Sequence, residues 1–177
     1  MDGAALSGAA RYPFKGLEAD VSEMSDCVVI GIGNLLMSDD GIGVHAVRYL
    51  RQRLTLDVEL LEGGIYSPDL LYFLENRRKA VFIDGVDAGE EPGTIYRFSP
   101  HQVARGKTAP ALSLHDYGLY DLLNAAILLD QCPEEVTIIA VQVKSLETGM
   151  ELSGELRDRL PDIYRLVMEE LDGSQRR

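Results

Sequence analysis

Short runs of β-branched and apolar residues alternate along this chain with longer stretches of helical spacing. This alternation is typical of an α/β fold, because parallel strands need long crossovers that are usually helical. The predicted strands cover 27–32, 57–61, 79–84, 94–98 and 136–143. The predicted helices cover 41–54, 68–75, 116–129 and 154–171, and Pro161 is expected to kink or split the last of them.

The strand over 94–98 differs from the others in how it is reached. Only a turn at Glu90-Glu91-Pro92-Gly93 separates it from the preceding strand, which is too short for a helical crossover. We therefore expect it to run antiparallel to that strand, in a sheet that is otherwise parallel.

Size and charge narrow the class of protein further. A chain of 177 residues is expected to fold as one domain, and its net charge of −12 argues against nucleic-acid binding and against an anionic lipid surface. No apolar run reaches the roughly 20 residues of a membrane span. We expect residues 1–25, which show no secretory signal, to form a loose arm before a single domain over 26–177.

The two cysteines add a prediction of compartment. Cys27 and Cys132 are far apart in sequence and show no metal-binding spacing. Two scattered thiols fit a reducing compartment, so the cytoplasm is the simplest prediction.

Polar residues follow the predicted strands at the edge where α/β sheets carry their sites. Asp40 follows the first strand, Asp84 ends the third, and His101 and His115 both precede the third predicted helix. Two carboxylates and an imidazole are able to hold a divalent transition metal with open positions. The structural alternative to metal binding is that aspartates such as Asp39 and Asp40 serve only to cap or begin a helix. Spacing does not choose between the two histidines, whereas His45 is expected to be solvated.

A dinucleotide site is a weaker interpretation of the first loop. Gly31-x-Gly33 follows a strand and precedes a helix, but the sixth position of the fingerprint is Leu36 rather than glycine. Asp39 and Asp40 would also repel a pyrophosphate at the helix start. A P-loop is excluded because the chain has no GK[ST].

Four segments together resemble the hydrogenase maturation endopeptidases. They are GIGNLLMSDDGIGVHAV, VFIDGVDAGEEPGT, SLHDYGLYDLL and VQVKSLETGMELS, in this order, and the resemblance extends from about Cys27 to Leu171. It implies a three-layer α/β sandwich with a twisted five-stranded sheet. It also implies a cytoplasmic peptidase that removes a C-terminal peptide from the precursor of a [NiFe] hydrogenase large subunit after nickel insertion.

The resemblance also assigns residues. The family's three metal-ligand positions map onto Asp40, Asp84 and His115, and Ser113-Leu114-His115-Asp116-Tyr117-Gly118 matches the context of the family histidine, whereas His101 does not. These three residues are the predicted catalytic and metal-binding residues, with nickel brought by the substrate and other divalent metals able to substitute. The chain departs from the family after Gly63-Gly64, where Ile65-Tyr66-Ser67 replaces the usual Thr-x-Gly, so the particular hydrogenase partner stays open.

The predicted chemistry is that of a metal-dependent or aspartyl endopeptidase. No HExxH motif and no serine or cysteine nucleophile with a paired histidine is evident. Two other classes remain possible from sequence: a nickel-checkpoint module that binds precursor without cleaving it, and a nucleotide-binding enzyme. The glycines at 31, 33, 41 and 43 are expected to allow close packing of loop and helix at the site.

Overall fold

The computed structural model describes residues 25–65, 68–100 and 117–175. It contains a five-stranded sheet in the order β2-β1-β3-β5-β4. The strands are β1 (Cys27–Ile32), β2 (Glu59–Gly64), β3 (Lys79–Val86), β4 (Ile95–Phe98) and β5 (Glu135–Gln142). The helices are the 3-10 turns η2 (Ser38–Gly41) and η3 (Pro68–Phe73) and the α-helices α1 (Ile42–Arg51), α3 (Tyr117–Leu128), α4 (Gly154–Arg157) and α5 (Leu160–Gln175).

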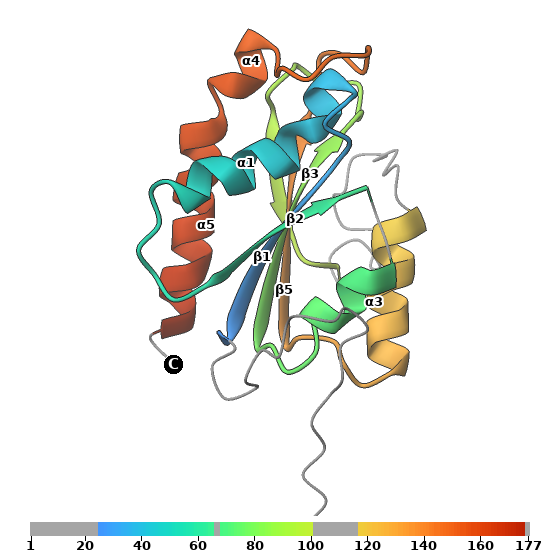
Figure 1. Ribbon diagram of the computed structural model, residues 1–177, viewed down its shortest axis with the longest axis vertical. Coiled ribbons are helices and arrows are strands. Elements are labelled where there is room, and N and C mark those ends of the chain that lie inside the picture. Colours follow the sequence, from blue (N-terminus) through green and yellow to red (C-terminus); the bar gives the residue numbers. More distant parts are fainter. Residues whose placement is uncertain (1–24, 66–67, 101–116, 176–177) are drawn as a thin grey trace, which may run out of the picture.

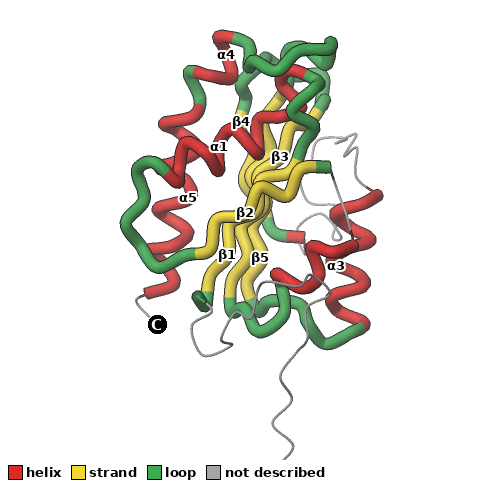
Figure 2. Tube along the Cα trace, viewed as in Figure 1, coloured by secondary structure: helices red, strands yellow, loops and turns green. Residues whose placement is uncertain are grey.

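Helices cover both faces of the sheet, so the predicted three-layer sandwich is confirmed (Figure 1). α1 and α5 pack on one face, where Val29, Val81 and Ile139 meet Leu50 and Val167. η3 and α3 pack on the other face, and Figure 2 shows the sheet between the two helical layers. β1 and β3 are buried along their whole length, as expected of parallel strands with helices on both sides.

The edge strand β4 is antiparallel, as the sequence predicted, but it does not form a hairpin with β3. β5 lies between the two, and β4 pairs with it from Ile95↔Val141 to Phe98↔Ile138. β1, β2, β3 and β5 are parallel to one another. The short connection predicted the orientation of β4. The position of β5 between β3 and β4 depends instead on residues that follow β4 in the sequence, so no local pattern predicted it.

Most predicted elements agree with the structure within a few residues, and the break expected at Pro161 is confirmed. The last helix is split into α4 and α5, because Pro161 lacks an amide hydrogen and therefore belongs to a first helical turn. Ser153 caps α4 by accepting a hydrogen bond from Leu156 N at 3.4 Å. β2 begins two residues later than predicted and continues to Gly64.

A buried ion-pair network closes the amino edge of the sheet. Lys79 Nζ lies 2.5 Å from Glu170 Oε2 and 3.3 Å from Glu135 Oε2, so it joins β3, β5 and α5. Burial alone would raise the pKa of Glu170, but the hydrogen bond and charge of Lys79, together with Thr137 and Arg97, hold that pKa below its ordinary value. This carboxylate is therefore stabilised in its charged form.

Two further predictions concern membrane spans and the N-terminal arm. No helix in the described part of the chain is both long and apolar enough to cross a bilayer. The predicted arm, residues 1–25, lies outside the described residues except for Ser25.

Candidate active site

The loop after β1 carries Asp40 to the carboxyl edge of the sheet. Gly33 adopts a φ of +132°, and a side chain there would overlap the carbonyl oxygen of Asp40. A side chain at Gly43 would overlap the carbonyl oxygens of Ile32 and Ile83. The predicted role of these glycines is confirmed, since they let η2 and the start of α1 lie directly against β1 and β3.

Asp84 lies near the end of β3 and is only 4% exposed. Its Oδ1 accepts a hydrogen bond from Gly85 N at 2.8 Å. A Cβ atom at Gly85 would lie 3.2 Å from the carbonyl oxygen of Asp39, so η2 packs on β3 beside Asp84. The structure thus brings the segments of Asp40 and Asp84 together, as the sequence predicted.

Asp40 is half-buried, and its carboxylate organises the loop in front of it. Asn34 N donates a hydrogen bond to Asp40 Oδ2 at 2.8 Å, and Asn34 Oδ1 accepts one from Leu36 N at 2.9 Å. One carboxylate oxygen of Asp40 is thereby tied to the backbone of the loop. The carboxylate is therefore both positioned and accessible at the edge of the site.

Asp39 has a different role from its neighbour Asp40, to which the family resemblance assigned the metal-ligand position. It is fully buried, and its carboxylate accepts hydrogen bonds from Lys144 N and Ser145 N at 3.0 Å and from Ser153 N at 2.7 Å. Asp39 therefore fixes the segment from Lys144 to Ser153 against η2. No run of neighbouring residues signals this role, because its partners are more than 100 positions away.

The two candidate histidines, His115 and His101, lie outside the described residues. The third ligand therefore stays a prediction. Among residues 25–65, 68–100 and 117–175, no group of three or more His, Cys, Asp or Glu side chains is arranged to hold a metal ion. Of the three predicted ligands, the structure describes only Asp40 and Asp84.

His45 was expected to be solvated, and this expectation is wrong. The residue is half-buried in α1, and its Nε2 atom is buried without a hydrogen-bond partner in the described part of the chain. Burial lowers the pKa of His45, although a hydrogen bond to the backbone of Met150 opposes this effect. At neutral pH the ring is therefore held in its uncharged form.

Gln142 is a further residue that organises this edge. It is buried at the end of β5, and its Oε1 accepts a hydrogen bond from Ala88 N at 2.8 Å while its Nε2 donates to Asp87 Oδ1 at 3.2 Å. These contacts hold the turn that follows β3. The only sequence signal for this role was the position of Gln142 at the end of an apolar strand.

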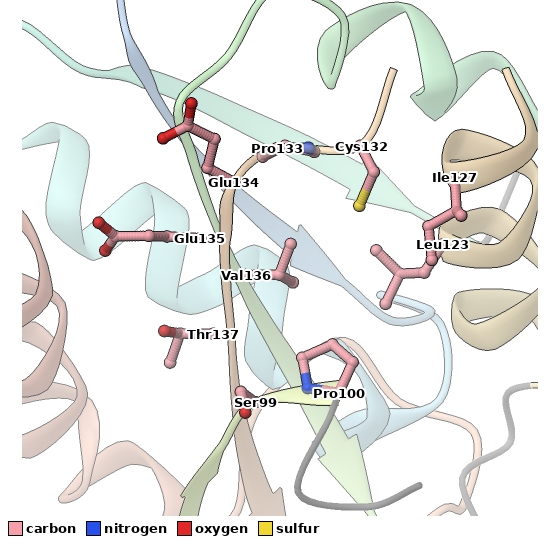
Figure 3. A pocket seen from close by; sticks show the side chains of 10 residues that line it. All are labelled: Ser99, Pro100, Leu123, Ile127, Cys132, Pro133, Glu134, Glu135, Val136 and Thr137. Atoms are coloured by element: carbon pink, nitrogen blue, oxygen red, sulfur yellow. The ribbon is translucent and has the colours of Figure 1, made fainter. Parts of the chain in front are cut away.

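A pocket of about 280 Å³ lies elsewhere, at the start of β5. Figure 3 shows the Cys132 side chain beside Leu123 and Ile127 of α3, and Pro100 on the opposite wall. Burial raises the pKa of the Cys132 thiol, which favours its protonated form. Because Thr137 lines the pocket and Asp84 pairs with Ala140 further along β5, the pocket is distinct from the carboxylate site.

Comparisons with known proteins identify the family of the chain. The family model of the HycI hydrogenase maturation proteases matches residues 44–170. The hydrogenase expression/formation protein HupD of Bradyrhizobium diazoefficiens is 34% identical, over 85% of this chain and 80% of HupD. The hydrogenase 2 maturation protease of Escherichia coli is also 34% identical, over 71% of this chain and 78% of that protein.

Solved structures show the same fold. The hydrogenase maturating endopeptidase HybD from E. coli superposes with a TM-score of 0.74 at 30% identity, covering 84% of this chain and 93% of HybD. The [NiFe] hydrogenase maturation protease HybD from Thermococcus kodakarensis gives a TM-score of 0.68 at 26% identity, covering 81% of this chain and 97% of that protein.

The fold and the relatives therefore identify the chain as an α/β peptidase, as the sequence predicted. The chain belongs to the hydrogenase maturation protease family.

Proposed function

We propose that this peptidase removes the C-terminal extension from the precursor of a [NiFe] hydrogenase large subunit, in the cytoplasm and after nickel insertion. In this proposal the nickel is part of the substrate, bound by the precursor's own side chains. Asp40, Asp84 and His115 contact it and so place the scissile bond beside the metal. Other divalent metals are expected to occupy the same three residues.

The observation that carries the proposal is the convergence of two acidic segments at one edge of the sheet. η2 packs on β3 beside Asp84, which places Asp40 and Asp84 on neighbouring segments. Carboxylate oxygens and an imidazole nitrogen are a donor set that suits a divalent transition metal such as nickel. Family membership supports the peptidase reaction.

The chain's own residues contribute mainly by positioning. Asn34 N holds the carboxylate of Asp40, and Gly85 N holds that of Asp84. Fixing the scissile bond against such a rigid site turns a bimolecular encounter into an almost unimolecular one. A metal beside the scissile carbonyl supplies polarisation of that carbonyl or activation of water.

The test is cleavage of a nickel-loaded and a nickel-free large-subunit precursor, followed by mass spectrometry of the products. We expect the extension to be released only from the nickel-loaded form. Equal cleavage of both forms contradicts nickel recognition, and binding without release of a peptide indicates a nickel-checkpoint module instead. Stabilisation by a dinucleotide that persists in Asp40→Ala favours a nucleotide-binding enzyme.

Variants test the ligand assignment. We expect Asp40→Asn and Asp84→Asn to lower cleavage by about 100-fold, because an amide is a much weaker metal ligand than a carboxylate. Asp130→Asn is the matched control, since Asp130 is exposed in the turn after α3 and its φ of +57° suits asparagine. His115→Ala is expected to abolish processing and His101→Ala to leave it nearly intact; the reverse result refutes the choice of histidine.

A further inference from the structure

Three large apolar side chains are exposed on loops at the carboxyl edge of the sheet. Leu36 is 59% exposed, Ile65 is 69% exposed and Met150 is 61% exposed. They come from the loop after β1, the end of β2 and the segment before α4. We call these three residues the apolar rim.

Backbone hydrogen bonds join the loops that carry Leu36 and Met150. Gly149 N donates to Leu36 O at 3.0 Å, and Ser38 N donates to Gly149 O at 2.8 Å. Met37 and Gly149 form a β-bridge, and the two loops meet at the top of Figure 1. The two exposed side chains therefore lie on loops whose backbones are joined, rather than on independent loops.

The same loops reach the candidate active site. Leu36 N donates to Asn34 Oδ1, and Asn34 N donates to Asp40 Oδ2. On the other side, Gly33 N donates to the carbonyl oxygen of Gly64, the residue before Ile65, at 2.9 Å. The loops that carry the apolar rim are thus linked to the loop of Asp40, so a polypeptide bound at Asp40 would lie near the rim.

The charged side chains that flank Met150 are acidic, and one of them is paired, since Arg157 Nη2 lies 3.3 Å from Glu151 Oε2. Glu147 and Glu151 flank Met150, both are exposed, and the segment between them carries no basic side chain. Asp39 fixes this segment through its bonds to Lys144 N, Ser145 N and Ser153 N, so these groups form a rigid surface. Such a surface complements an apolar patch bordered by basic side chains.

We infer that the apolar rim docks the body of the precursor protein next to its C-terminal extension. The inference rests on the proposed function, because the occupant is the substrate itself. In this arrangement the carboxylates act on the scissile bond, while Leu36, Ile65 and Met150 contribute binding that is the same before and during the reaction. Loss of such uniform binding raises KM and leaves kcat unchanged.

The experiment compares Leu36→Ser/Met150→Ser and Ile65→Ser with the wild type, using nickel-loaded precursor. We expect KM of the double variant to rise about tenfold, as is usual when apolar anchors of an interface are lost, with kcat within about twofold of the wild type. Leu128→Ser is the matched control, since Leu128 is 86% exposed at the end of α3. An unchanged KM in both rim variants, or an equal rise in the control, overturns the inference.

Binding of the precursor, measured by calorimetry, separates this inference from the proposed function. If the wild type binds the precursor without cleaving it, the proposed function fails, and weaker binding by the rim variants still supports docking. If the wild type cleaves the precursor and the rim variants bind it equally well, only the docking inference fails. If the wild type neither binds nor cleaves the precursor, both are refuted. Thermal unfolding of each variant verifies that it is folded.

Discussion

Replacing Asp39 by alanine is expected to destabilise the protein far more than the same change at Asp40. Asp39 is fully buried and accepts three backbone hydrogen bonds, from Lys144, Ser145 and Ser153. Asp40 is half-buried and accepts one from Asn34. The two aspartates are neighbours in sequence, so they form a matched pair.

The expected magnitude follows from those contacts. A hydrogen bond to a charged acceptor contributes about 1.5–3 kcal/mol, and a buried donor left without a partner costs a similar amount. Water entering the space left by the carboxylate would recover part of this loss, so we expect Asp39→Ala to lower the free energy of unfolding by about 3–5 kcal/mol. The single, partly exposed contact of Asp40 predicts a loss of about 1 kcal/mol.

Urea unfolding of both variants and the wild type measures the difference. The expected loss for Asp39→Ala corresponds to a fall in Tm of roughly 2–4 °C per kcal/mol in a chain of this size. Asp40→Ala should instead remain close to wild type in stability while losing peptidase activity. A loss below about 1 kcal/mol for Asp39→Ala, or equal losses for both variants, would show that the carboxylate of Asp39 does not hold the Lys144–Ser153 segment.

Two further predictions concern the ion-pair network and the close packing of the first loop. Because the pKa of folded Glu170 lies below its unfolded value near 4.5, its ionisation stabilises the fold above that pH, and the stability is lost as the pH falls through the folded pKa. Unfolding measured from pH 7 to pH 3 should therefore show wild type and Glu170→Gln converging at low pH; a constant difference would contradict this linkage. Gly33→Ala should be strongly destabilising because its side chain meets the backbone of Asp40, whereas Gly89→Ala, with positive φ but open space, should cost only about 1–2 kcal/mol. Equal losses in a thermal melt would show that backbone strain, not packing, decides both positions.

The sequence predicted the class of fold because its signals are local. Buried strands such as Cys27–Ile32 and Lys79–Val86 read as continuous apolar runs when helices cover both faces. Pro161 marks the break between α4 and α5 for an equally local reason, its missing amide hydrogen. The placement of β4 beside β5 had no such signal, because strand pairing depends on residues distant in sequence.

The site shows the same division. Two adjacent aspartates at the start of a helix are chemically alike, and sequence patterns place both at the carboxyl edge. Asp39 is a buried acceptor because it binds the backbone N–H groups of Lys144, Ser145 and Ser153, which lie more than 100 residues further along the chain. Asp40 is only half-buried. His45 was misassigned for a related reason, since its hydrogen-bond partner, the backbone of Met150, lies more than 100 residues further along the chain.

By itself, the sequence determined the alternation of strands and helices, the acidic residues at the strand ends and the motifs that mark the family. These depend on local backbone preference and on residue types. The tertiary structure alone decided which hydrogen bonds Asp39 accepts and that the loops carrying Leu36 and Met150 are joined. The physical reason is that burial and hydrogen-bond partners arise only when distant segments of the chain pack together.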